Sequence, residues 1–291
     1  MRKRGNEKMS KKVKIVADTA SDLGKELYEK YDIDLVAMNI RLGENEYEDG
    51  ENFSPDSIYE FYDQTGKLPT TSCPNVSTYV DTFQKWTAQG YEVVSISISS
   101  GFSASYHNSE LAAEEVPGVY TVDSRNLSTG IGLLVLEAAE MAQQGMEAKD
   151  IAEKLRELTA NIRASFILDN LLYLWKGGRC SGVAALGANL LKLKPCIEVV
   201  DGKMNVGKKY RGALGACLRN YVNDKLANNP NVDTKRIFIT HSGMTDPSLI
   251  DEVKKEVEKL QKFDEILITR AGCTVSSHCG GNTLGILYVV K

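Results

Sequence analysis

The stretch EVVSISISSGFSASYHNSELAAEE, from Glu92 to Glu115, decides the fold. Its first part has the apolar pattern of a strand over residues 93–98, and its last part has the pattern of a helix that ends near Glu115. A strand that leads into a helix through small polar residues gathers hydroxyls and free backbone amides at the helix N-terminus, where anions bind. The stretch therefore predicts a site for a small polar or anionic group at Ser99, Ser100, Gly101 and Ser103.

Two other segments have the same polar character. TTSCPN, from Thr70 to Asn75, precedes a helical stretch, and TVSSHCGGNTLG, from Thr274 to Gly285, precedes a final apolar strand. Three such loops in one chain suggest that they contribute to one shared site.

Length and composition favour a small ligand. A chain of 291 residues is near the upper limit for one core, so two α/β lobes are expected. The formal net charge of -4 and the pI near 5.6 weigh against nucleic acid as the main partner, because that partner needs a basic face.

The six cysteines are scattered without a CxxC pair, which favours reduced thiols and a cytoplasmic location. Cys273, His278 and Cys279 lie close in sequence, but the second ligand pair of a zinc site is missing, so we expect no metal. The start of the chain, residues 1–11, is basic and lacks the apolar run of a signal peptide or membrane helix, which predicts a disordered tail.

Alternating strand and helix patterns predict an N-terminal lobe over residues 12–162, with a mainly parallel sheet flanked by helices. A short buried strand over 12–18 opens it, the strand-like DIDLVAMNIRL follows a first helix, and the expected helices are 24–31, 57–62, 76–89, 130–144 and 148–161.

From Arg163 the pattern changes, and we expect a C-terminal α/β lobe over residues 163–291 with a mixed sheet. A hairpin turns at Asp201-Gly202, a strong short-range hairpin signal. The expected helices are 213–227 and 247–260, the expected strands are 236–241 and 265–269, and a polar loop around His278 precedes the last strand.

The loop over residues 99–103, called the Ser loop below, could also hold the nucleophile of a serine hydrolase. GFSAS resembles the nucleophile elbow GxSxG, although Ser105 replaces the second Gly. Ser103, His278 and Asp18 would then form a catalytic triad. No Walker loop and no GxGxxG occurs, so the chain has no nucleotide site of its own by these motifs.

Other polar motifs have both a functional and a structural interpretation. KGGR, from Lys176 to Arg179, is an anion-binding candidate or a tight turn. Arg211 could pair with an acidic head group or be an exposed charge at a strand end. Thr71 and Ser72 could bind ligand or cap the following helix, and His278 could be a core histidine.

Taken together, the motifs resemble the DegV family of bacterial fatty-acid-binding proteins, the FakB-like component of fatty acid kinase, over nearly the whole chain. The motifs are DTASDL at 18–23, TTSCP at 70–74, SSGFSASY at 99–106, VDS at 122–124, KGGR at 176–179, LLKLKP at 190–195, YRG at 210–212 and SSHCGGNTLG at 276–285. The sequence departs from the common pattern at Cys73, Ala104, Ser105 and Asn282.

The resemblance implies a two-lobed fold with an apolar tunnel that holds a long-chain fatty acid. It implies that the hydroxyls of Thr71 and Ser103 bind the carboxyl group and that His278 and Arg211 support the head group. Further candidates near the head group are Ser72, Ser100, Gly101, Asp18 and Arg179.

The resemblance also implies that this chain is not an enzyme by itself. A separate ATP-binding kinase subunit would phosphorylate the carboxyl group, and the acyl phosphate would enter phospholipid synthesis. The implied ligand is the fatty acid without any cofactor, and transient contact with a membrane surface is compatible with that role.

Overall fold

The computed structural model describes residues 12–50, 53–184 and 193–291. The basic tail predicted for residues 1–11 lies outside this part of the chain, as do residues 190–192 of the LLKLKP motif. Within the described ranges, every helix is too short or too polar to cross a lipid bilayer.

The N-terminal lobe is built on a four-stranded sheet A, in which all strands are parallel, as predicted. Its strand order is β2 (Asp34–Val36), β1 (Val13–Asp18), β6 (Glu92–Ser97) and β7 (Val119–Asp123). Ile15 and Ile96 belong to the core on one face of the sheet, and Val16 and Val93 to the core on the other. The two faces are covered by α3 (Val76–Thr87) with α4 (Ser105–Glu115), and by α5 (Thr129–Gln143) with α6 (Ala148–Leu158).

A small antiparallel sheet B, which the sequence did not indicate, extends this lobe. Its strand order is β4 (Asn45–Glu48), β3 (Asn39–Leu42) and β5 (Thr70–Ser72). The expected single strand DIDLVAMNIRL is therefore split between two sheets, and part of the expected TTSCPN loop is a strand. Strand β5 is fixed by a pairing partner distant in sequence, which local patterns do not show, whereas β3 and β4 are joined by a tight turn at Gly43 and Glu44.

The C-terminal lobe carries a six-stranded mixed sheet C, which confirms the predicted α/β architecture. Only β11 and β12 pair in parallel; the other neighbours are antiparallel. The strand order is β10 (Lys203–Tyr210), β9 (Lys194–Val200), β8 (Ile162–Ile167), β13 (Leu284–Val290), β11 (Val232–His241) and β12 (Glu265–Arg270).

The longer predicted helices are confirmed, with ends within three residues of the expected positions. In the C-terminal lobe these are α9 (Leu214–Leu226) and α10 (Ser248–Leu260), and α2 (Pro55–Thr65) is longer than expected. The short elements are α1 (Lys25–Lys30), α7 (Leu172–Gly177), α8 (Ser181–Ala184), α11 (Cys273–Cys279) and the 3₁₀ turns Thr19–Ser21 and Thr159–Asn161. The loop predicted around His278 is wrong, because this segment forms α11.

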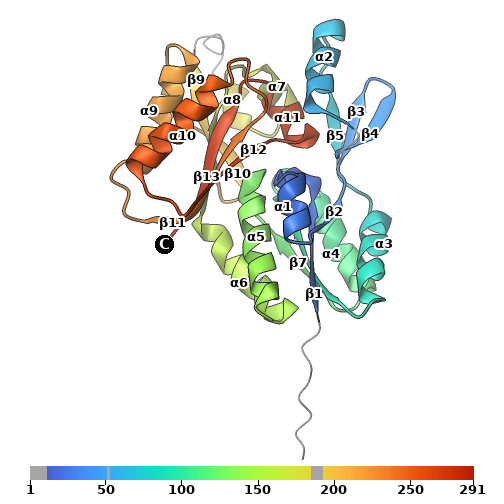
Figure 1. The fold of residues 1–291 in the computed structure, drawn as a ribbon. Coiled ribbons are helices and arrows are strands. Elements are labelled where there is room, and N and C mark those ends of the chain that lie inside the picture. Colours follow the sequence, from blue (N-terminus) through green and yellow to red (C-terminus); the bar gives the residue numbers. More distant parts are fainter. Residues whose placement is uncertain (1–11, 51–52, 185–192) are drawn as a thin grey trace, which may run out of the picture.

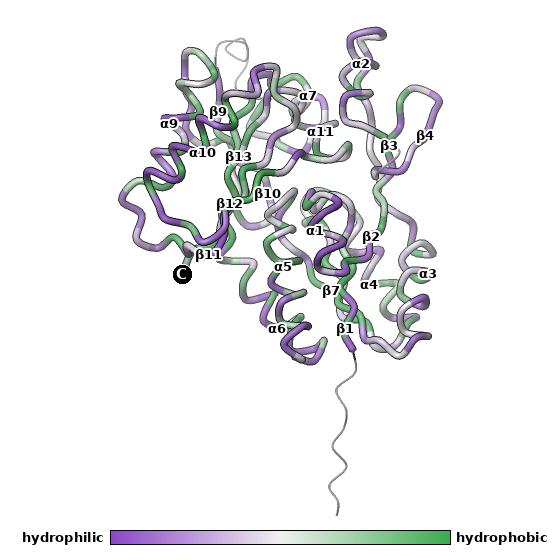
Figure 2. Tube along the Cα trace, in the orientation of Figure 1, coloured by the Kyte–Doolittle hydropathy of each residue, from purple (hydrophilic) through white to green (hydrophobic). Residues whose placement is uncertain are grey.

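Helix α5 is the central layer of the molecule. It lies between sheets A and C and contacts strands of both (Figure 1). Its residues are mostly hydrophobic (Figure 2), and most of them are buried. The largest apolar core contains Ile96 and Leu134 from the N-terminal lobe and Phe166 and Leu287 from sheet C. The two lobes therefore share one core, and the boundary near residue 163 stays a prediction.

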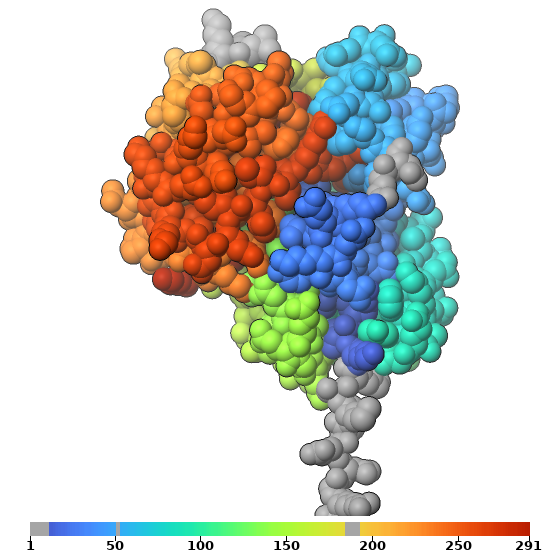
Figure 3. Space-filling view, in the orientation of Figure 1, coloured from blue at the N-terminus to red at the C-terminus, as the bar shows by residue number. Residues whose placement is uncertain are grey.

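Polar contacts also connect the lobes. Arg236 on β11, only 4% exposed, donates to Glu140 on α5 at 2.7 Å and to Glu265 at 2.6 Å. Helix α2 contacts the C-terminal lobe, at the upper right of Figure 3. The hydroxyl of Tyr59 on this helix donates to the Ser242 carbonyl at 2.6 Å. These contacts fix the relative position of the lobes.

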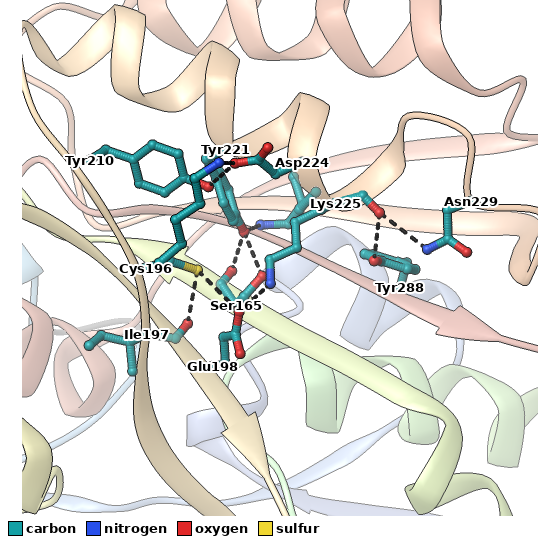
Figure 4. Close-up of polar contacts among 12 residues, drawn as sticks. Ser165, Cys196, Ile197, Glu198, Tyr210, Tyr221, Asp224, Lys225, Asn229 and Tyr288 are labelled. Atoms are coloured by element: carbon teal, nitrogen blue, oxygen red, sulfur yellow. Dashed lines mark hydrogen bonds and ion pairs between the residues drawn. The ribbon is translucent and has the colours of Figure 1, made fainter.

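A buried tyrosine attaches α9 to sheet C (Figure 4). The Tyr221 hydroxyl donates to the Ser165 carbonyl at 2.6 Å and accepts from the Ile286 N–H at 3.0 Å. Lys225 on the same helix forms an ion pair with Glu198 on β9. This cluster holds the outer helix layer without reaching the cavity described below.

Replacing Tyr221 with Phe is expected to lower the free energy of unfolding by about 1–3 kcal/mol, because the Ile286 N–H loses its buried hydroxyl acceptor. The matched control is Tyr288→Phe, which removes one longer contact of 3.3 Å to the Lys225 carbonyl and should cost less than about 1 kcal/mol. Urea unfolding of both variants measures the difference. Equal losses would contradict this account of α9.

Candidate functional site

The three polar loops predicted to share a site do line one cavity, of about 550 Å³. The lining includes residues 71–73, 100–104, 274–275 and 278–279, and other side chains of both lobes supply the rest. The volume lies in the range of sites that enclose a small organic ligand.

A side-chain hydrogen bond joins Thr71 and His278, two cavity-lining residues that come from different lobes. Thr71 lies on β5, where pairing opposite Ile40 of β3 fixes its backbone. Its Oγ1 is 2.8 Å from Nε2 of His278, which comes from the last turn of α11. The contact brings sheet B and the C-terminal lobe together at the polar end of the cavity.

His278 is a neutral imidazole at physiological pH. Burial, and then the positive charge of Arg179, lower its pKa to about 4. Its Nδ1 has no hydrogen-bond partner among the residues that the structure describes. Gly177 lies against this nitrogen, and a Cβ at that position would stand only 2.5 Å from it. The short α7 therefore needs a glycine here so that α11 can pack closely.

Ser103 reaches the cavity from the loop between β6 and α4. The Ser103 N–H donates to the Ser99 carbonyl at 3.2 Å, which closes the loop. The Ser103 Oγ accepts from the Ser105 N–H at 3.2 Å and lies 2.8 Å from the Ser105 hydroxyl. Ser103 is thus held by the first turn of α4, with its hydroxyl at the cavity surface.

A hydrogen bond next to the cavity-lining Gly101 joins the two lobes. The Ser99 hydroxyl donates to the Gly202 carbonyl at 2.8 Å, at the tip of the β9–β10 hairpin. A Cβ at Gly101 would lie 2.4 Å from the same carbonyl oxygen, so only glycine fits. The predicted Asp201-Gly202 turn therefore serves a second purpose, because it packs on the Ser loop.

The cavity is polar at its rim and apolar inside. Ser72, Ser100, Gly101 and Arg179 line it and are exposed, and the Arg179 guanidinium donates to the Gly177 carbonyl at 2.7 Å. Buried apolar and sulfur-containing side chains line the interior: Met38, Ile98, Phe102, Leu127, Leu174, Met204 and Cys279. A ligand with one polar end and an apolar body fits this gradient.

Two predicted site residues do not line the cavity. Asp18 lies under the Ser loop, where its carboxylate accepts from the Ile98 N–H at 2.7 Å and burial raises its pKa to about 7. Arg211 follows the end of edge strand β10 and is exposed, away from the cavity wall. Direct contact of either residue with a head group is not supported by these positions.

The hydrogen bonds of a Ser-His-Asp triad are not formed. His278 Nε2 contacts Thr71, Ser103 contacts Ser105, and the Asp18 carboxylate contacts a backbone amide. All six cysteines are free thiols, and Cys73 lies in the cavity wall. In the part of the chain described, no three His, Cys, Asp or Glu side chains are grouped to hold a metal ion.

Two parts of the site were missed by the sequence analysis. Met38 and Met204 lie among strand residues without any motif. Thr274 lines the cavity one helical turn before His278, and this four-residue spacing would have indicated a shared face if α11 had been predicted.

Comparison with known proteins identifies the chain's relatives. Residues 12–291 match the family model described as "Uncharacterised protein, DegV family COG1307". A DegV domain-containing protein of Clostridium perfringens is 32% identical over 283 residues, which cover 96% of this chain and 98% of the relative.

Solved structures with the same fold include two whose descriptions name a lipid. A DegV family protein from Thermus thermophilus, described by its fatty acid binding, is 26% identical with a TM-score of 0.86, covering 96% of this chain and 100% of that one. A stearic acid-binding protein from Eubacterium ventriosum is 28% identical with a TM-score of 0.82, covering 96% and 98%.

The neutral state of His278 can be tested by NMR titration. We expect its imidazole to titrate near pH 4 instead of near 6.5, and Arg179→Ala to raise that midpoint because it removes a nearby positive charge. Since the unfolded chain takes up this proton between pH 6.5 and 4 and the native chain does not, the contribution of His278 to stability is complete above pH 6.5 and is lost as the pH falls toward 4. Arg211→Ala is the matched control. A midpoint near 6.5 in the wild type would show that His278 is not buried as described.

Proposed function

The chain belongs to the DegV family, and on this premise we propose that it binds a long-chain fatty acid in the cavity between its lobes. The carboxyl group is held by Thr71 and Ser103 at the polar end, and the tail lies among the apolar side chains. We further propose that a separate ATP-dependent kinase subunit phosphorylates the bound carboxyl group, so that this chain presents a substrate in the cytoplasm.

The observation that carries the proposal is the pairing of Thr71 with a neutral His278 at the rim of an apolar cavity. A carboxylate accepts hydrogen bonds and cannot donate, so both the Thr71 and Ser103 hydroxyls donate to it. The Thr71 oxygen then accepts from Nε2–H of His278, which leaves Nδ1 as the unprotonated nitrogen. This assignment agrees with the absence of a Nδ1 partner among the described residues.

The Thr71 and Ser103 hydroxyls offset the main unfavourable term in binding, which is the desolvation of the carboxylate. A carboxylate that leaves water without gaining hydrogen bonds is strongly disfavoured. Hydrogen bonds to a charged group are the stronger ones. The tail supplies most of the affinity: about fifteen methylenes at about 0.8 kcal/mol each give a gross gain of roughly 12 kcal/mol, reduced by the entropy of immobilising a flexible chain.

The exposed rim supports the role of a second protein. Ser72, Ser100 and Arg179 surround the polar end and are open to solvent, so a partner can reach the carboxyl group. The Arg179 guanidinium lies where negative charge would increase on phosphorylation. The chain contains no GxGxxG or Walker motif, which fits a division of labour in which the partner binds ATP.

The first test is mass spectrometry of an organic extract of the purified protein. We expect about one fatty acid per chain, because burial of the tail gives a high affinity and the ligand then stays bound during purification. A delipidated and refolded sample that is offered palmitate provides the control. Absence of both bound lipid and palmitate uptake would contradict the proposal and favour another small ligand.

The second test separates binding from presentation. Ser103→Ala and Thr71→Val are expected to lower acyl phosphate formation with the kinase subunit by about tenfold to a hundredfold, because each removes a hydrogen bond to a charged group. Lipid occupancy should fall less, since the tail contacts remain. Thr82→Val on α3, outside the cavity lining, is the control. A Ser103→Ala variant that loses occupancy and phosphorylation equally would refute this assignment.

A further inference from the structure

Helix α11 is attached to sheet B at both of its ends. At its C-terminal end, His278 contacts Thr71 on β5 at 2.8 Å. At its N-terminal end, Asp49, which directly follows β4, accepts from the Cys273 N–H and the Thr274 N–H, both at 2.9 Å. Both ends of this short helix of the C-terminal lobe are therefore held by polar contacts with sheet B and the residue that follows it.

The cap of α11 comes entirely from the other lobe. The residue at its N-cap is Gly272, which has no side chain to cap the helix. The Gly272 N–H donates to the Asp22 carboxylate at 2.8 Å, so three successive amides are satisfied by two carboxylates. A Cβ at Gly272 would approach both carboxylates to 3.2 Å. Because Gly272 has no side chain, the Asp22 and Asp49 carboxylates can reach these backbone amides.

Both carboxylates are buried and fixed. Asp49 is 3% exposed, and its N–H donates to the Met38 carbonyl at 2.8 Å, next to β3. Asp22 is 4% exposed and accepts from the Ser128 hydroxyl at 2.5 Å, at the start of α5. Burial, and the nearby charges of Asp49 and Asp18, raise the pKa of Asp22.

We propose that Asp49, assisted by Asp22, is a positioning residue: it sets the place of α11 relative to β5, and so the contact of His278 with Thr71 that orients the ligand's carboxyl group. The identity of the ligand in this inference rests on the proposed function, whereas the placement of α11 by Asp49 does not depend on it. Asp49 does not line the cavity and acts only through α11.

The charge and the length of Asp49 both matter in this arrangement. An amide keeps one acceptor oxygen but presents an NH₂ group to the second backbone N–H, which repels it. Glutamate keeps the charge and both oxygens but is longer by one methylene, so it should displace the start of α11 without leaving its amides unsatisfied.

The experiment compares Asp49→Asn and Asp49→Glu with two controls outside the cavity. Asp246→Asn changes another carboxylate that caps a helix, through the Ser248 N–H of α10 at 3.1 Å. Tyr221→Phe lowers stability in the C-terminal lobe without touching α11. The readouts are the imidazole ¹⁵N shifts of His278 in lipid-free protein, the melting temperature, and the dissociation constant for palmitate.

We expect both Asp49 variants to change the His278 shifts, and Asp49→Asn to weaken palmitate binding by about tenfold, the loss of one good hydrogen bond. The two controls should leave the His278 shifts and the dissociation constant for palmitate unchanged, although Tyr221→Phe lowers the melting temperature. If Asp49→Asn does not fold, Asp49→Glu decides the question. Unchanged His278 shifts in a folded Asp49 variant would overturn the proposal.

The two proposals fail separately. If the wild type binds no palmitate, the proposed function fails, while the His278 shifts still test the positioning role. If palmitate binds normally to an Asp49 variant with altered His278 shifts, the contact of His278 with Thr71 does not orient the ligand, which also overturns the inference.

Discussion

The contact between Thr71 and His278 at the candidate head-group site depends on how the two lobes are packed, because each lobe supplies one partner. Thr71 comes from sheet B, Ser103 from the loop after β6, and His278 from the C-terminal lobe. A hydrogen bond tolerates only a few tenths of an ångström before it weakens. The shared core around α5 and the buried Arg236 contacts are therefore conditions for a site as well as for stability.

Burial shapes the charges of this region. It lowers the pKa of His278 and raises the pKa of Asp18, so in each case the neutral form is favoured. An anionic ligand would thus meet hydroxyls and an uncharged imidazole at the inner side, with the cationic Arg179 only at the exposed rim. In the proposed complex, this arrangement would hold a carboxylate by hydrogen bonds and leave its charge accessible from outside.

Local sequence signals were sufficient for sheet A, for the longer helices and for the grouping of the three polar loops. The choice of Thr71, Ser103 and His278 as head-group residues came from the DegV resemblance. The hydroxyl-rich ends of strands and the apolar periodicity are short-range properties, and both were visible in the chain. Sheet B and α11 were not predicted, because β5 pairs with a strand 30 residues away and α11 takes its cap from another lobe. The DegV resemblance named Arg211 and Asp18, but it did not show that one ends an edge strand and the other is buried beneath a loop.

The close approach of Gly101, in the cavity wall, to the Gly202 carbonyl means that this point of the wall packs on main chain of the other lobe. A side chain at position 101 would displace the β9–β10 hairpin, so substitution cannot reshape the cavity at this point. Met38, Leu127 and Met204 also line the cavity, and their side chains are flexible or branched. Selection for a longer, shorter or bent ligand would therefore act on such side chains and leave Gly101 unchanged.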